Sequence, residues 1–255
     1  NEVVGEYAIK SFKAATQALK ADLIDVLVTA PINKYNIQSE EFKFPGHTDY
    51  LDQELEGDAL MLMVSDSLRI GLLTDHIPVN EIATHLTEAL IRKKITTINK
   101  SLIQDFSINK PKIAVLGLNP HAGDGGVIGS EDEKLIRPIV KKMFGEGIMV
   151  FGPYPADGFF GSNQYEKFDA VIATYHDQGL IPFKTLSFGN GVNFTAGLEK
   201  IRTSPDHGTA YDIAGKNLAN YNSFKEAVYL ALDVYKSRNE YKEMSKRPLK
   251  TKEKQ

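Results

Sequence analysis

The sequence predicts an α/β fold built on a mostly parallel sheet. Short runs of β-branched and other apolar residues, with the length of buried strands, alternate with longer segments whose apolar residues recur at helical spacing. Three of the strand-like runs, at residues 69–74, 112–118 and 168–174, each stop within a few residues of a histidine. Strands, loops and helices that alternate in this way are typical of a mostly parallel sheet.

Composition limits the functions that the chain can have. Its 255 residues are enough for one large α/β domain or two closely packed subdomains. A formal net charge of −3 leaves no basic surface for nucleic acid or for an anionic membrane. Without cysteine, metal ligands must be histidines and carboxylates. No apolar run reaches the length of a membrane span. The absence of cysteine fits a reducing cytosol, so we expect a cytoplasmic protein.

The first expected elements are a helix over residues 2–20 and a strand over residues 24–29. A turn at Pro45-Gly46 then presents His47 and Thr48. These two residues could belong to a functional loop, or Thr48 could only cap a helix over residues 49–55. The sequence leaves both interpretations open.

The middle of the chain predicts further strands, at residues 60–64 and 70–73, and then a long helix that begins near Asn80. After the strand at 112–118 comes a glycine-rich loop, residues 122–129, which matches no phosphate-binding fingerprint. The helix that follows this loop should end at Gly145. The expected core face of the long helix consists of Ile82, Leu86, Leu90, Ile95, Ile98 and Leu102.

The last third begins with a strand at residues 148–151. Asp157 follows it, either as a functional carboxylate or as the N-cap of a short helix over residues 158–160. A final helix is expected at residues 224–235. Residues 236–255 are charged and lack apolar periodicity, which predicts a frayed tail.

Histidines near strand ends are the main functional signal. Because neighbouring parallel strands end at the same edge of a sheet, His76, His121 and His176 could meet there. Three neutral imidazoles with an open coordination position suit a catalytic divalent metal. Lys184 and Arg202 lie between strand patterns and short turns, which makes them candidates for binding an anion.

Several longer motifs follow one another along the chain. They lie at residues 29–34, 44–48, 118–123, 152–153, 156–157, 175–179, 189–193, 201–204 and 206–210. In these motifs the chain resembles the 4-hydroxythreonine-4-phosphate dehydrogenase family, NAD-dependent enzymes of pyridoxal phosphate biosynthesis. The resemblance covers nearly everything except the charged tail. It implies the fold of isocitrate and isopropylmalate dehydrogenases, with two intertwined α/β subdomains around a cleft, and an N-terminal segment preceding Asn1 that this chain lacks.

The resemblance also implies roles for individual residues. The family's metal ligands fall on the three histidines already named, and Asp177 is either a neighbour of such a ligand or a proton relay. Asp157 is a second catalytic candidate. The implied substrate contacts are His47, Thr48, Lys184, Asn193 and Arg202. His207, Gly208, Thr209 and Ala210 are similar to the loop that meets the adenosine end of the cofactor in the related dehydrogenases.

The implied reaction is oxidation of 4-phosphooxy-threonine by NAD or NADP, followed by decarboxylation to 3-amino-2-oxopropyl phosphate. It would use a divalent metal such as zinc, cobalt or magnesium, in a homodimer whose active site is shared between subunits. Two alternatives stay open at this point. One is a related dehydrogenase of another phosphorylated hydroxy acid, such as erythronate 4-phosphate. The other is a hydrolase in which three histidines activate water through a metal.

Overall fold

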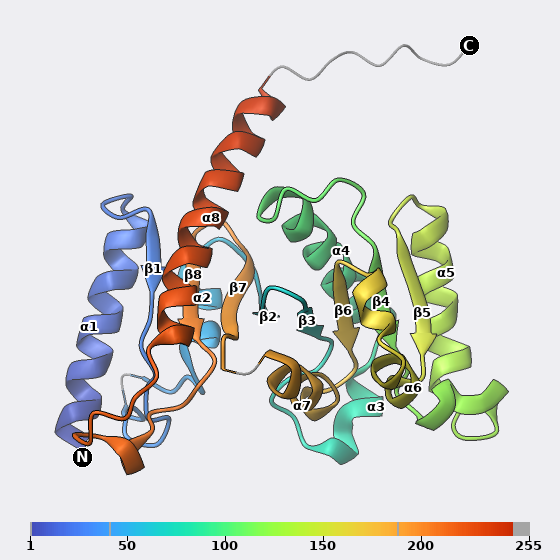
Figure 1. Cartoon of the computed structure of the whole chain (residues 1–255), viewed down its shortest axis with the longest axis horizontal. Coiled ribbons are helices and arrows are strands. Elements are labelled where there is room, and N and C mark those ends of the chain that lie inside the picture. Colours follow the sequence, from blue (N-terminus) through green and yellow to red (C-terminus); the bar gives the residue numbers. More distant parts are fainter. Residues whose placement is uncertain (1, 41, 188, 247–255) are drawn as a thin grey trace.

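One mixed sheet organises the computed structural model, which describes residues 2–40, 42–187 and 189–246 (Figure 1). Within those ranges eight strands lie in the order β1-β8-β7-β2-β3-β6-β4-β5. In chain order they are β1 (Val26–Val28), β2 (Gly57–Val64), β3 (Arg69–Leu72), β4 (Ile113–Leu116), β5 (Val150–Tyr154), β6 (Ala170–Ala173), β7 (Val192–Leu198) and β8 (Ile201–Pro205).

Parallel pairing dominates the sheet. The pairs β1–β8, β3–β6, β6–β4 and β4–β5 are parallel, whereas β2 pairs with β3 and β7 in the antiparallel sense, as β7 does with β8. The strands followed by histidines, β3, β6 and β4, are neighbours. The predicted α/β fold with a mostly parallel sheet is therefore confirmed.

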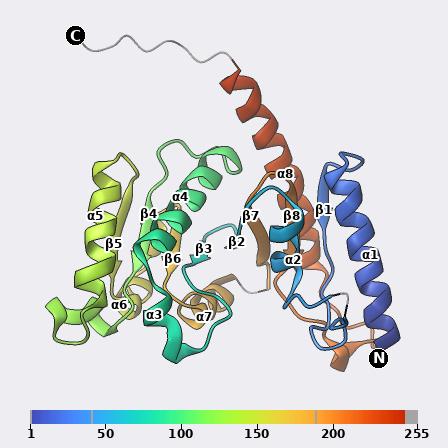
Figure 2. The same ribbon diagram turned by 180° about the vertical axis from the view of Figure 1, so that it is seen from behind.

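Helices cover both faces of this sheet. The views from the front and from behind show α6 and α7 on one side of the β3–β6–β4 part and α4 on the other (Figures 1 and 2). The helices are α1 (Glu2–Lys20), α2 (His47–Glu54), α3 (Ile82–His85), α4 (Glu88–Gln104), α5 (Arg137–Gly145), α6 (Ala156–Gly161), α7 (His176–Ser187) and α8 (Asn222–Ser245). None of the helices in the described ranges has the length and apolar character that crossing a bilayer needs.

Buried side chains form three clusters that hold these layers together. The largest joins α4, α5 and α8 to one face of the sheet and includes Ile95, Met143 and Val234. A second packs α6 and α7 on the other face, through residues such as Phe159 and Phe183. A third lies between α1, α2 and the β1 end of the sheet. Burial of these apolar faces stabilises the fold by about 25 cal/mol for each Å² of apolar surface area removed from water.

The long helix expected from Asn80 is interrupted. A 3-10 turn (Val79–Glu81) and the short α3 come first, and α4 begins only at Glu88. Thr87 is the N-cap of α4, and its hydroxyl accepts a hydrogen bond of 3.2 Å from the Leu90 backbone N–H. The new start shifts the buried face, so Ile91 is fully buried while Leu90 is half-buried.

The expected frayed tail from residue 236 is wrong for residues 236–245, which continue α8. Arg238 is buried, and its Nε atom lies 2.6 Å from Oδ1 of Asp105, the residue after α4. Its Nη1 atom donates to the Glu199 carbonyl at 2.7 Å. A buried ion pair thus anchors this part of the helix in place of apolar contacts. Residues 247–255 of the expected tail lie outside the described residues.

Candidate functional site

A pocket of about 290 Å³ gathers most of the predicted site residues. Its walls come from the segment after β1, from the start of α2, from β2, β7 and β8, and from the carboxyl ends of β3 and β6. The predicted residues that line it are His47, Thr48, His76, His176, Lys184, Asn193, Arg202, His207 and Gly208. Residues separated by up to 161 positions in the sequence of this chain, from His47 to Gly208, therefore face one space.

Arg202 is buried at the base of this pocket with 2% of its surface exposed. Its hydrogen-bond partners are hydroxyl groups: Nε and Nη2 donate to Thr29 Oγ1 at 3.0 and 2.7 Å, and Nη1 donates to Thr195 Oγ1 at 3.2 Å. Within the described residues no carboxylate pairs with it. Burial lowers the pKa of Arg202 to about 9, so the group is still charged at neutral pH. Since buried charges are normally paired, the countercharge is expected from an anionic ligand.

His47 lies at the start of α2 and packs edge-on against Phe12, with 4.6 Å between the ring centroids. Burial, then the charges of Arg202 and Lys34, lowers the pKa of His47 to about 3. The imidazole is therefore neutral at physiological pH and serves as a hydrogen-bonding group. The interpretation of Thr48 as a helix cap is wrong, because the helix starts at His47, two residues before the expected start, and Gly46 occupies the N-cap position.

Lys184 and Asn193 provide further polar atoms. Lys184 extends from the last turn of α7 and is exposed, and Asn193 comes from β7. The Oδ1 atom of Asn193 is buried and has no hydrogen-bond partner in the chain. An unsatisfied buried amide oxygen costs about 1–3 kcal/mol, so a donor from a ligand is expected there.

Four charged residues of the pocket were not predicted as site residues: Lys34, Asp49, Asp75 and Asp206. Asp206 follows the last residue of β8, and burial raises its pKa although Lys184 acts in the opposite direction. Lys34 is the last residue of the motif at residues 29–34, and Asp206 is the first residue of the motif at residues 206–210. Their charge and their place in these motifs were the signals that could have identified them.

His76 and His176 lie side by side where β3 and β6 end, with 5.9 Å between their ring centroids. The Nδ1 atom of His176 is 2.8 Å from Asp177 Oδ1. A proton on this Nδ1, assigned from the carboxylate contact, leaves Nε2 free to bind a metal. The ring of His76 reaches solvent, yet desolvation by the surrounding protein, followed by the charge of Lys34, lowers its pKa and favours the neutral form.

His121 lies apart from this pair. Although β4 is next to β6, the chain beyond β4 turns through a left-handed segment, and His121 is exposed with φ of 54°. Among the residues that the structure describes, no group of three or more histidines and carboxylates is arranged to hold a metal. One chain therefore brings two of the three predicted ligands together, and their convergence with His121 stays a prediction for two chains.

Asp157 also lies outside the pocket. It is exposed in the first turn of α6, and Pro155 occupies the N-cap position of that helix. The interpretation of Asp157 as an N-cap is wrong, because α6 begins at Ala156, before the expected start. Its role in catalysis stays a prediction.

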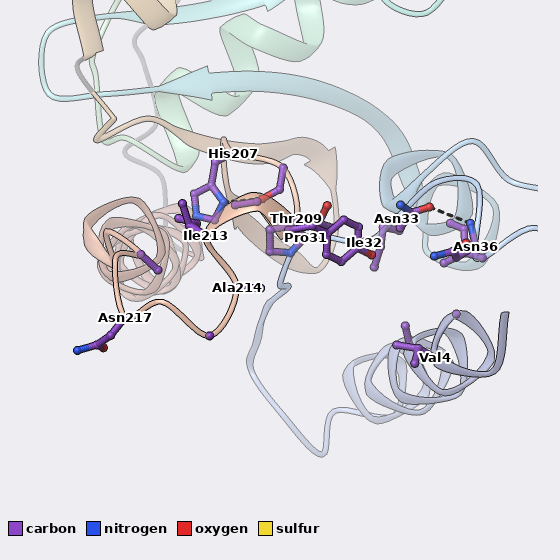
Figure 3. Close-up of a pocket in the computed structure, with 18 residues that line it drawn as sticks. Val4, Pro31, Ile32, Asn33, Asn36, His207, Thr209, Ile213, Ala214 and Asn217 are labelled. Atoms are coloured by element: carbon purple, nitrogen blue, oxygen red, sulfur yellow. Dashed lines mark hydrogen bonds between the residues drawn. The ribbon is translucent and has the colours of Figure 1, made fainter. Parts of the chain in front are cut away.

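A second pocket, of about 700 Å³, adjoins the first, and the two share Pro31, Ile32, His207 and Gly208 in their walls. Figure 3 shows His207 and Thr209 near Pro31 and Ile32, with Val4 of α1 across the cavity. The Nδ1 atom of His207 lies 2.9 Å from the Gly208 carbonyl oxygen. The predicted cofactor loop, residues 207–210, is thus part of a cavity with many apolar side chains, as is common for binding sites of organic cofactors.

Comparison with known proteins gives a consistent result. The family model described as pyridoxal phosphate biosynthetic protein PdxA matches residues 1–231. The 4-hydroxythreonine-4-phosphate dehydrogenase of Bacteroides thetaiotaomicron is 52% identical over 248 residues, which make up 96% of this chain and 68% of that relative. The crystal structure of 4-hydroxythreonine-4-phosphate dehydrogenase from Klebsiella pneumoniae has a TM-score of 0.80 at 35% identity, covering 92% of this chain and 72% of that one.

The predicted relationship to isocitrate dehydrogenases is confirmed at the level of the fold. Isocitrate dehydrogenase from Methylococcus capsulatus has a TM-score of 0.52 at 14% identity, and the match covers 91% of this chain and 74% of that one. At this identity the likeness concerns the arrangement of strands and helices alone.

Proposed function

Because the chain belongs to the family of the pyridoxal phosphate biosynthetic protein PdxA, we propose that it oxidises 4-phosphooxy-threonine with NAD or NADP. Decarboxylation of the resulting β-keto acid then yields 3-amino-2-oxopropyl phosphate. The name of the Bacteroides relative, 4-hydroxythreonine-4-phosphate dehydrogenase, supports this substrate. A biosynthetic role of this kind favours a location in the cytoplasm.

The observation that carries the proposal is the buried guanidinium of Arg202, which has only hydroxyl partners among the described residues. A phosphate or carboxylate of the substrate would supply the countercharge, and the planar fork of the guanidinium suits either group. Lys184, on the wall of the same pocket, adds a second positive charge. A doubly anionic small molecule fits this electrostatic environment.

The remaining substrate contacts follow from the same pocket. The neutral imidazole of His47 and the hydroxyl of Thr48 can orient polar substituents without adding charge. The unpaired Oδ1 of Asn193 needs a donor, which a hydroxyl or ammonium group of the substrate would provide. These groups hold the reacting carbon in one orientation, which by itself contributes to catalysis.

The cofactor is proposed to occupy the larger pocket. Its shared wall at His207 and Gly208 would bring the nicotinamide end toward the substrate, while residues 209–210 and 213–217 would contact the adenosine end. The smaller pocket is lined both by residues that follow β1 and β8 and by His76 and His176, which follow β3 and β6. We propose that these two parts of the chain are the two intertwined subdomains around the cleft.

One chain supplies two of the three side chains that would hold a divalent cation. His76 and His176 offer two imidazoles at 5.9 Å between centroids, and Asp177 orients the second through its Nδ1 atom. The third ligand would be His121 of a second copy of the chain, because this residue is exposed and does not line the pocket of its own chain. When bound, such a cation lowers the pKa of a coordinated hydroxyl and stabilises negative charge on an enolate. The proposal therefore includes a homodimer with shared active sites.

Nicotinamide reduction separates the proposal from its alternatives. The protein is incubated with NAD or NADP and 4-phosphooxy-threonine, and the absorbance of the reduced nicotinamide is recorded together with release of carbon dioxide. The proposed function requires both signals. Reduction with erythronate 4-phosphate alone would indicate the related dehydrogenase, and release of phosphate without reduction would indicate a hydrolase.

A further inference from the structure

The side chain of Gln178 connects the ends of two neighbouring strands. Its Oε1 atom accepts hydrogen bonds from the backbone N–H and the hydroxyl of Thr174, at 2.7 and 2.9 Å, directly after β6. Its Nε2 atom donates to the Gly117 carbonyl at 2.6 Å, directly after β4. The segment with His176 and the segment that leads to His121 are therefore tied together by one amide group.

Asp132 restrains the same segment from the other side. Its carboxylate is fully buried and accepts hydrogen bonds from the backbone N–H of Leu118 at 2.7 Å and of Asn119 at 3.0 Å. It also accepts one from the Asn119 side chain at 2.9 Å. Residues 117–119, which lead directly into Pro120 and His121, are thus held by two side chains from different parts of the chain.

The conformation after these residues is one that needs such restraint. Residues 121–125 all have positive φ, including the non-glycine residues His121 at 54°, Ala122 at 50° and Asp124 at 43°. The left-handed conformation of each non-glycine residue costs on the order of 1–2 kcal/mol, and it persists only where the surrounding structure imposes it. Close packing leaves little freedom, since a Cβ atom at Gly117 would lie 2.9 Å from Ala122 Cα.

We propose that Gln178 is a positioning residue that sets the loop of His121 relative to His176, with Asp132 completing the restraint. The inference rests on the proposed dimer, in which His176 of a chain is a ligand at its own metal site and His121 of the same chain is a ligand at the other chain's site. The bridge would therefore set how each chain presents His121 to the metal site of the other chain. Hydrogen-bonded neighbours of metal ligands typically affect metal affinity by 10–100-fold, and the bridge acts here through the backbone that leads to the ligand.

The chemistry of the bridge explains why an amide is needed. The oxygen of Gln178 accepts two hydrogen bonds and its nitrogen donates one. A carboxylate can only accept and an ammonium group can only donate, so neither can replace the amide. Gln178→Glu keeps the acceptor toward Thr174 but places a second oxygen against the Gly117 carbonyl. This substitution therefore breaks the contact to the His121 loop and spares the contact to the β6 end.

Zn²⁺ affinity of the whole protein is the direct test, measured by competition with a chromophoric chelator. Gln178→Glu should raise the Kd for Zn²⁺ by about tenfold or more, and Asp132→Asn, which disturbs the other side of the segment, should act in the same direction. Gln17→Glu, an exposed position in α1, makes the same charge change and should leave the Kd unchanged. Thermal unfolding is recorded for each variant.

A double-mutant cycle distinguishes positioning from a general structural role. In a His121→Ala background, Gln178→Glu should change the Kd for Zn²⁺ by less than about twofold, because the residue through which it acts is gone. The inference is overturned if Gln178→Glu changes the Kd for Zn²⁺ equally with and without His121. It is also overturned if Gln178→Glu changes this Kd less than about threefold while His121→Ala weakens Zn²⁺ binding. Unfolding of the protein by both Gln178→Glu and Asp132→Asn would overturn it as well. If His121→Ala itself leaves the Kd unchanged, the proposed metal site fails and the inference falls with it.

Discussion

Arg202 and Thr29 form a two-pronged contact in which Nε and Nη2 of the guanidinium donate to the same hydroxyl oxygen, at 3.0 and 2.7 Å. The contact joins β8 to the residue after β1, deep in the polar pocket. A hydroxyl group orients the guanidinium but does not neutralise it. The guanidinium is therefore oriented and still positively charged, so it can bind an anionic ligand.

Arg202→Lys should weaken substrate binding although it conserves the charge. An ammonium group cannot donate in the planar fork, and the loss of hydrogen bonds worth about 1.5–3 kcal/mol corresponds to an increase of roughly 10–100-fold in KM. Steady-state kinetics with 4-phosphooxy-threonine give the KM. Arg92→Lys, at a surface ion pair with Glu146, is the matched control and should leave the KM unchanged. An unaltered KM in Arg202→Lys would mean that this residue does not bind the substrate.

Arg238→Met should destabilise the folded state by about 3–5 kcal/mol, because it leaves the carboxylate of Asp105 buried without its cation. The free energy of unfolding is obtained from urea denaturation. Arg137→Met breaks an exposed pair with Glu133 and should cost no more than about 1 kcal/mol. Equal effects of the two substitutions would show that the end of α8 is not anchored by the buried pair.

His47 should make the stability depend on pH below neutrality. Its pKa is 6.5 as the ordinary value and about 3 in the folded protein, so between these values the unfolded chain binds a proton that the folded chain does not. The contribution of the neutral His47 ring to the free energy of unfolding is fully present above pH 6.5 and is lost as the pH falls toward 3. The free energy of unfolding, measured over this range, should fall less steeply in His47→Gln than in the unmodified protein. Identical slopes would show that the ring is not kept neutral by its surroundings.

The sequence predicted the fold and several of the polar residues that line the pocket because both depend on regular patterns. Apolar runs identified β3, β4 and β6, and parallel strands place the residues that follow them near one edge, which is why His76 and His176 meet. The start of α4 was also encoded, since Thr87 followed by Glu88 is a typical helix beginning.

Other features depend on contacts that no periodic pattern records. The position of His121 follows from six successive residues at positive φ, residues 121–126, three of which are not glycine. The continuation of α8 depends on the pairing of Arg238 with Asp105, which lies 133 residues away in the sequence. A search for apolar periodicity cannot detect a helix that is anchored by a buried ion pair.

The central claim is that His76 and His176 of one chain share a metal with His121 of another. It is tested most directly by mixing two inactive variants, His121→Ala and His176→Ala, and measuring nicotinamide reduction after verified subunit exchange. In a mixed dimer one site has both substitutions and the other has none, so random exchange should restore about a quarter of the unmodified activity. No recovery of activity after complete exchange would contradict the shared site.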